Sequence, residues 1–253
     1  MQLFFEPAAL VGFCLVLVRA GAWVAVCPPF NMPAIPVRVR AGFAVAMSLV
    51  LAERVGSQVD DLSTGSLVGA LFTQMLAGFA LGFFVFVILS AVQSAGELID
   101  LQVGFSLGGI IDPMSGNMSA PIGRLHQLLG LAVLFAINGH VIVARAFIRS
   151  VEVAPLGQMD SGNIAPLLAK LVAVLLSASI EIALPVLTAL FLTEVALGFL
   201  GKAAPQLNIL VIGFAVKSMV AFALLGATLV LLPEAVESLL VRSLRAALGV
   251  FSS

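Results

Sequence analysis

The strongest constraint in this sequence is the stretch from Leu62 to Gly96, which contains no charged residue. As one straight helix it would be about 50 Å long, well beyond a hydrocarbon layer of roughly 30 Å. It must therefore tilt, bend or project from the bilayer. The whole chain is similarly apolar, with 61% hydrophobic and 10% charged residues, so it has too few polar side chains to cover a soluble core. The sequence predicts an all-α integral membrane protein.

The composition also excludes several classes of function. The 12 basic and 13 acidic residues nearly balance, so the chain offers no basic face to a nucleic acid. Its two histidines are His126 and His140, and no group of Cys, His and carboxylate residues has the spacing of a metal site. Cys14 and Cys27 stand in apolar surroundings that favour packing as small hydrophobic side chains. We therefore expect no enzymatic activity, no catalytic or metal-binding residue and no cofactor.

Apolar runs and helix breakers predict about six long helices, several of them broken or bent. These segments are Leu10–Val26, Ala41–Ala52, the uncharged run, Leu125–Ile148, Leu167–Leu200 and Ile209–Leu232. We expect Pro185 to kink or split the fifth segment and Pro233 to open an amphipathic C-terminal tail. Gly78 and Gly82 have the spacing of a close-packing helix face.

Connectors rich in proline or polar residues separate these segments. They are the proline cluster Pro28–Pro36, the polar stretches Glu53–Ser66 and Val151–Asn163, and Gly201–Asn208, where Gly201 suits a helix C-cap. The most unusual stretch is Gly96–Gly123, which is rich in Gly, Ser and Met and has little helical periodicity. It predicts an ordered but irregular loop, longer than loops usually run without a function.

Six charged side chains lie within or at the ends of apolar segments: Glu97, Asp100, Glu181, Glu194, Lys202 and Lys217. A charge at the bilayer centre costs roughly 2.5–3.5 kcal/mol on the insertion scale. These residues therefore face an aqueous pathway, pair within an assembly, or stand at helix ends in the headgroup region. Glu97 and Asp100 are three residues apart and share a helix face. The two lysines are each placed to pair with a carboxylate on a neighbouring helix or subunit.

Three groups of residues resemble the signature of the flagellar biosynthetic protein FliR family. They are Gly96-Glu-Leu-Ile-Asp-Leu-Gln-Val-Gly-Phe-Ser106 with Asp112-Pro113, Asn138-Gly139-His140 with Phe147 and Ser150, and Ala204-Pro205-Gln206-Leu-Asn208 with Gly213-Phe214. The resemblance covers essentially the whole chain, and the motifs keep the order and spacing of the family. The related subunit of virulence-type injectisomes shares the general plan, and the Asn-Gly-His group favours the flagellar branch.

The resemblance implies a subunit of the export gate of a type III secretion system. In that family one such subunit joins several copies of FliP-like and FliQ-like small membrane subunits in a conical helical complex. The complex lies in the bacterial inner membrane, in the flagellar basal body, and unfolded flagellar proteins pass through its channel. A FliB-type (FlhB-like) companion, other export-apparatus proteins and membrane lipid are the further partners implied. The chain would comprise a FliP-like portion over 1–162 and a FliQ-like helical hairpin with an amphipathic tail over 163–253.

A channel wide enough for an unfolded chain needs a closing element that is flexible, largely uncharged and deformable. Residues 105–123 meet that need, and the resemblance implies that they form the plug of the channel. The small or apolar residues that carry this expectation are Phe105, Gly108, Gly109, Ile110, Ile111, Met114, Gly116 and Met118. The alternative is an ordinary surface connector.

Two other functions are compatible with the residues alone. A proton-coupled transporter would relay protons through the four carboxylates named above, although the chain has no clear internal repeat. A membrane scaffold would need only packing faces. Lys and Arg are spread over nearly every loop, so the placement of the basic C-terminal tail in the cytoplasm rests on a weak charge bias.

Overall fold

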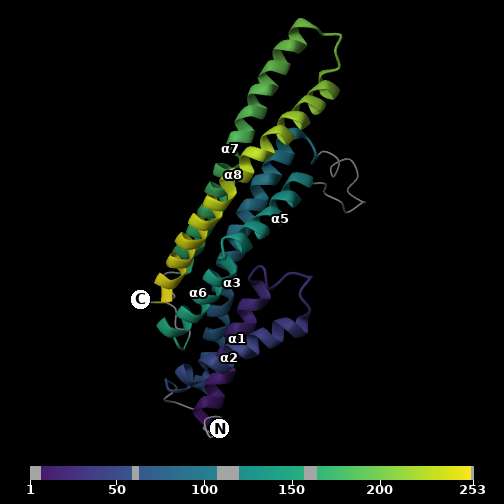
Figure 1. The fold of residues 1–253 in the computed structure, drawn as a ribbon. Helices are drawn as coiled ribbons and strands as arrows, with labels where there is room; N and C mark the ends of the chain where they lie inside the picture. Colours follow the sequence, from purple (N-terminus) through teal and green to yellow (C-terminus); the bar gives the residue numbers. More distant parts are fainter. Residues whose placement is uncertain (1–6, 59–62, 107–119, 157–163, 252–253) are drawn as a thin grey trace. The chain divides into compact units, whose positions relative to one another are not determined.

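The computed structural model describes residues 7–58, 63–106, 120–156 and 164–251. Within these ranges it contains seven helices and no strand (Figure 1). The helices are α1 (Pro7–Val26), α2 (Val37–Gly56), α3 (Thr64–Val103), α5 (Pro121–Ala136), α6 (Gly139–Val153), α7 (Ile164–Ala203) and α8 (Ile209–Phe251). The predicted all-α class is confirmed.

Four helices of the described part are long and apolar enough to cross a membrane, over Ala8–Val26, Thr64–Val103, Ala169–Ala203 and Ile209–Gly226. A fifth crossing results if α5 and α6 together count as one broken span. Helix α2 is not among them, because it includes the charged residues Arg38, Arg40, Glu53 and Arg54. The chain is an integral membrane protein.

The chain divides into two compact units, each built from segments that are distant in sequence. The first unit consists of Met1–Val87, Asn138–Leu171 and Leu239–Ser253, and the second of Ile88–Ile137 and Val172–Ser238. Helices α3, α7 and α8 therefore each contribute residues to both units.

Several helices have other bounds than the sequence predicts. The predicted helix over Leu125–Ile148 is wrong as a single element, because α5 ends at Ala136 and α6 begins at Gly139. Between them Asn138 has φ 56°, in the left-handed region that Asn tolerates better than most residues. From Thr64 onward, the uncharged run belongs to one helix, α3, which has 40 residues and extends about 60 Å at 1.5 Å per residue.

The prolines inside α7 and α8 do not end these helices. The expected split at Pro185 is wrong, as is the expected start of a separate tail at Pro233. Each proline removes one backbone hydrogen bond, but fully buried core residues lie on both sides of it: Ala183 and Val186 around Pro185, and Leu232 and Val236 around Pro233. The predicted C-cap at Gly201 is also wrong, because α7 continues to Ala203.

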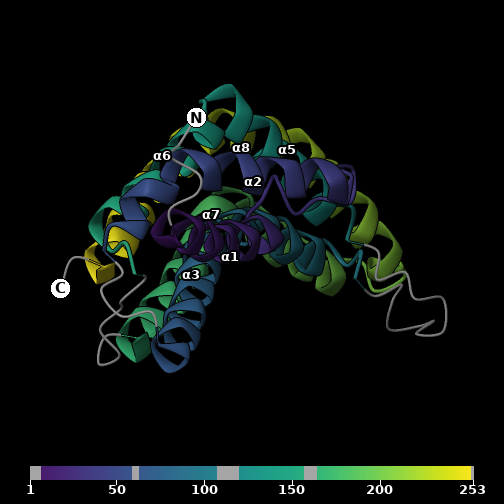
Figure 2. The same ribbon diagram turned by 90° about the horizontal axis from the view of Figure 1, so that it is seen from below.

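The first unit is organised around α1, which packs along α2 (Figure 2). Trp23 of α1 is fully buried, and its ring stacks on Phe147 of α6 with centroids 4.7 Å apart. Gly78 and Gly82 of α3 lie against the α1 backbone so closely that a Cβ at Gly78 would clash with the carbonyl oxygen of Arg19. The predicted close-packing face of these two glycines is thereby confirmed.

The second unit has a core shared by four helices. Its members come from the end of α3, the start of α5, and the facing stretches of α7 and α8, and include Ile99, Ile122, Val186, Leu190 and Leu225. Beyond this core α7 and α8 form a hairpin closed by residues 204–208 (Figure 1).

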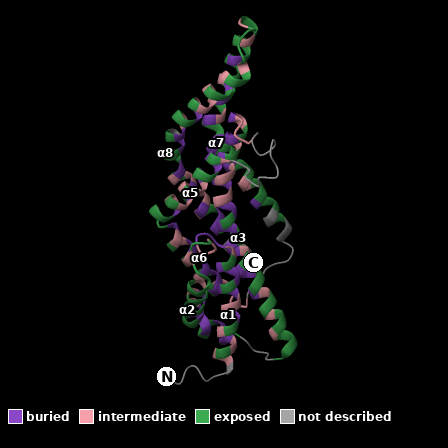
Figure 3. Cartoon of the chain, turned by 90° about the vertical axis from the view of Figure 1, so that its right-hand side faces the viewer, coloured by how far each residue is buried: buried purple, intermediate pink, exposed green. Residues whose placement is uncertain are grey.

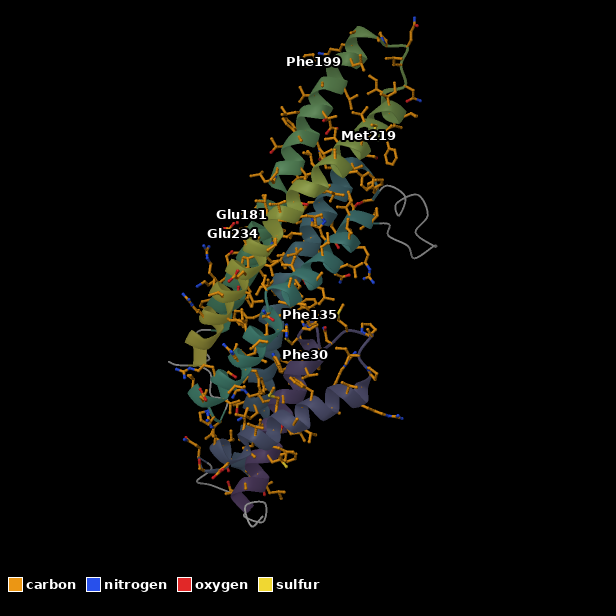
Figure 4. All side chains as sticks on the ribbon, in the orientation of Figure 1. Phe30, Phe135, Glu181, Phe199, Met219 and Glu234 are labelled. Atoms are coloured by element: carbon orange, nitrogen blue, oxygen red, sulfur yellow. The ribbon has the colours of Figure 1, made fainter. Side chains whose placement is uncertain are left out.

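The turn end of this hairpin is mostly exposed (Figure 3). Apolar side chains point away from both helices there, among them Phe199, which is 69% exposed, and Met219, which is 74% exposed (Figure 4). Only 17% of the span that begins at Ile209 is buried, so the single chain leaves most of this surface to lipid or to other proteins.

Candidate functional site

The two helices that flank residues 104–120 are joined at their facing ends by one carboxylate. Asp100, in the last turn of α3, is fully buried and accepts the backbone N–H groups of Ile122 at 3.1 Å and Gly123 at 2.8 Å. These are N–H groups of the first turn of α5, which lack partners within their own helix. Asp100 therefore caps α5 from a neighbouring helix and fixes where the segment between them begins and ends.

Two glycines allow α3 and α5 to approach each other closely at this junction. A Cβ at Gly96 would lie 2.7 Å from the Cα of Gly123, nearer than real Cβ atoms approach backbone. The α3 and α5 backbones touch there because neither glycine has a side chain. One turn further along α5, the buried His126 ring places Nδ1 3.0 Å from the carbonyl oxygen of Ile122, and its Nε2 has no hydrogen-bond partner within the described residues.

Phe105 anchors the start of the intervening segment to α8. Its ring meets the ring of Phe214 edge-on with centroids 5.5 Å apart, and lies 6.2 Å from that of Phe222. Gly104, with φ 105°, gives the chain a backbone conformation at the end of α3 that residues with side chains rarely adopt.

The irregular stretch is shorter than the sequence predicts at both ends. Helix α3 continues to Val103 instead of ending near Gly96, and Pro121–Gly123 already belong to α5. Pro121 stands in the first turn of α5, where its missing N–H costs nothing. The other residues predicted to form a plug are Gly108, Gly109, Ile110, Ile111, Met114, Gly116 and Met118, and they lie outside the described residues.

A second polar cluster lies where α3, α7 and α8 meet in the second unit. The Lys217 ammonium is 3.1 Å from Glu194, and it donates to the backbone oxygen of Gln102 at 3.4 Å. The Gln102 amide donates to the other Glu194 oxygen at 2.9 Å. These residues border a groove of about 840 Å³ that is otherwise mostly apolar, with Leu197 and Phe214 in its lining. The prediction that Lys217 pairs with a carboxylate of a neighbouring helix is confirmed.

The remaining predicted charges lie at the surface of the chain. Glu97 is exposed although it is only three residues from the buried Asp100, and it accepts a hydrogen bond from Gln93. Glu181 and Lys202 are also exposed, and neither forms an ion pair with another described residue. Among the described residues, these three charges therefore have no ion-pair partner.

Arg19 is not among the residues singled out from the sequence, yet its guanidinium is fully buried. It donates to the backbone oxygens of Ala154 at 2.8 Å and Ser150 at 2.9 Å, both at the C-terminal end of α6. Gln74 of α3 bonds the adjacent carbonyl of Pro155. The cation thus meets the negative end of the α6 dipole and ties α1 to α6. The one available signal was a single charge inside an otherwise apolar span.

Cys27 and Cys14 differ in their surroundings. Cys27 is buried just beyond α1, and its thiol donates to the carbonyl oxygen of Pro28 at 3.2 Å. Burial raises the pKa of this thiol, so it packs as a small hydrophobic group, as predicted. Cys14 is exposed on α1. No group of three or more metal-ligating side chains occurs in the part of the chain that the structure describes.

Together these features define a helical membrane subunit with capped helix junctions and wide apolar surfaces left uncovered. Residues 10–243 match the model of the family described as bacterial export proteins, family 1, and the chain belongs to that family.

Relatives in the family include proteins of both flagellar and virulence systems. The chain is 30% identical over 223 residues to the flagellar biosynthetic protein FliR of Pectobacterium carotovorum, covering 88% of this chain and 85% of the relative. It is 28% identical over 217 residues to FliR of Bacillus subtilis, with 84% of both chains covered. It is also 28% identical over 187 residues to the surface presentation of antigens protein SpaR of Shigella flexneri, covering 73% and 71%. The resemblance to the FliR family is confirmed.

Proposed function

We propose that this chain is a non-enzymatic subunit of the flagellar type III export gate in the bacterial inner membrane. In that role it would help to line and close the channel through which unfolded flagellar proteins leave the cell. The observation that carries the proposal is the match of residues 10–243 to an export family, together with flagellar relatives aligned over 84–88% of the chain.

The uncovered apolar surface supports membership of a complex. Phe199, Met219 and their neighbours on the α7–α8 hairpin are exposed in the single chain, and a patch of this kind marks a protein or membrane contact. FliP-like and FliQ-like small membrane subunits and an FlhB-like companion are the partners we propose. We further propose that residues 1–162 correspond to a FliP-like portion and residues 163–253 to a FliQ-like hairpin.

The proposed plug is the predicted segment 105–123, without Pro121–Gly123, which belong to α5. Its sequence supplies glycines and deformable apolar side chains, and the Asp100 cap together with the Phe105 contact gives it fixed attachment points. A segment held firmly at both ends can move aside for a passing chain and return without altering the helices around it.

An injectisome export gate is the second candidate, favoured by the likeness to SpaR, although that likeness covers less of the chain than the flagellar ones. A proton-coupled transporter has weaker support. Two of its four carboxylates already have structural partners, since Asp100 caps α5 and Glu194 pairs with Lys217.

The test is complementation combined with mass analysis. The chain is expressed in one bacterial strain that lacks FliR and in another that lacks SpaR, and secretion of the respective substrates is measured. Restored flagellar export, with the chain in a large complex containing small helical membrane proteins, is the expected result. Restoration of the injectisome alone would favour the second candidate. Solute transport by the single chain in vesicles, without such a complex, would contradict both.

A further inference from the structure

A groove of about 400 Å³ lies between α6 and the C-terminal part of α8, both within the first unit. Its floor is apolar, formed by Ile142, Ala146, Ile148, Val241 and Leu244. Its rim carries three arginines and one acid: Arg145, Arg149, Arg245 and Glu152. The groove thus combines a hydrocarbon surface with guanidinium groups from two different helices.

The positive charge of this rim is only partly neutralised. The carboxylate of Glu152 is shared between two arginines, because it pairs with Arg54 of α2 and lies 3.3 Å from Arg149. Neither Arg145 nor Arg245 forms an ion pair with any other described residue, and both are exposed. Arg145 and Arg149 are four residues apart, so they project from the same face of α6.

The two units also differ in net charge, and the first unit, which contains the groove, is the more positive. The first unit contains nine of the 12 basic residues, and the second unit contains seven of the 13 acidic residues. The nine basic residues are Arg19, Arg38, Arg40, Arg54, Arg145, Arg149, Lys170, Arg242 and Arg245. The even balance of the whole sequence conceals a net positive first unit, and the groove lies within it.

We propose that this groove binds an anionic phospholipid. The guanidinium groups of Arg145, Arg149 and Arg245 would hold the phosphate oxygens, for which their planar donors are suited. The acyl chain would cover Ile148, Val241 and the other floor residues. A free phosphate ion would leave that floor bare, and a soluble acidic peptide would have to bury backbone against it. Basic grooves between the helices of membrane proteins are known sites for such headgroups.

The proposal goes beyond export and requires only that the chain lies in a membrane. Its test uses the full chain, purified in mild detergent with whatever subunits accompany it. The groove variant is Arg145→Gln with Arg245→Gln. The matched control is Arg38→Gln with Arg242→Gln, which removes two exposed arginines of the same unit that do not line the groove. Unfolding temperatures of the three proteins verify that folding is unchanged.

Binding of phosphatidylglycerol is measured by native mass spectrometry, and its site by a photoreactive analogue. We expect label on α6 and the end of α8 in the parent and control proteins, and roughly thirtyfold weaker binding in the groove variant. Equal binding in all three proteins would overturn the proposal. So would inorganic phosphate competing as well as the lipid, or a photoreactive group placed at Ile148 that captures an acidic protein segment instead of lipid.

Discussion

The carboxylate of Asp100 lies 2.8 Å from the backbone nitrogen of Gly123, at a point where both residues are fully enclosed by their own unit. A short side chain at the end of α3 thereby accepts hydrogen bonds from the N–H groups at the start of α5, across 23 positions of sequence. Asp100 and Phe105 together hold the ends of the intervening segment, and Asp100 supplies the hydrogen bonds.

Replacement of Asp100 by alanine should therefore destabilise the protein. It leaves two buried N–H groups of α5 without an acceptor, which we expect to cost about 3 kcal/mol. The measurement is thermal unfolding of the purified protein in detergent. Glu97→Ala is the control, because Glu97 is exposed one turn earlier on the same helix, and the cap would be refuted if both variants unfolded at the same temperature.

Arg19→Leu should be at least as damaging. The variant removes charge-assisted hydrogen bonds to the carbonyls of Ser150 and Ala154, for which we expect a loss of about 3–5 kcal/mol. Arg38→Leu, at an exposed position of α2, should leave stability nearly unchanged. The effect of each variant is measured as the abundance of folded protein in membranes. An abundance of Arg19→Leu equal to that of the parent would contradict the assigned role.

Gly78→Ala and Gly69→Ala form a matched pair within α3. A methyl group at Gly78 would meet the backbone of α1, and such overpacking typically costs about 1–3 kcal/mol. Nothing lies within 4 Å of a Cβ at Gly69, so that variant should gain up to about 1 kcal/mol from helix propensity. Denaturation of the two proteins under the same conditions checks that their changes in stability have opposite signs.

Lys217→Ala should impair assembly more than Arg245→Ala. The Lys217 side chain is only 15% exposed and meets both Glu194 and Gln102, whereas Arg245 projects from the surface of α8. Because Glu194 is 55% exposed, the pair within the single chain should contribute only about 1 kcal/mol. Copurification of partner subunits is the readout, and equal yields from the two variants would show that the pair is unimportant.

Deletion of Gly108–Ser119, which lie outside the described residues, tests the proposed plug. The helices on both sides and the Asp100 cap are unchanged, so we expect the complex to assemble. Without a closing element the channel should admit ions and small solutes at rest. Membrane conductance, measured while complex formation is monitored, distinguishes this outcome from that of a surface connector, whose loss would leave the membrane tight.

Local rules of sequence predicted the helical class, the main apolar segments and the partner of Lys217, because each follows from composition or from spacing along one helix. The same rules failed at Pro185 and Pro233, where packing on both sides outweighs one missing hydrogen bond. They also failed at Arg19 and Asp100, whose partners are backbone groups rather than opposite charges. No residue type at position 123 or 154 marks it in the sequence as a hydrogen-bond partner.

The distance in sequence between Arg19 and Ser150 also has a consequence in time. At a synthesis rate of about 5–20 residues per second, the 131 positions between them take roughly 7–26 s to appear. During that interval α1 is already a nascent membrane segment, while the carbonyls that will receive its guanidinium have not been made. Until α6 emerges, the guanidinium lacks these acceptors, and a charge in a membrane span without partners costs roughly 2.5–3.5 kcal/mol on the insertion scale. A chain that ends before α6 would therefore keep Arg19 without the two carbonyl acceptors that it has in the complete fold.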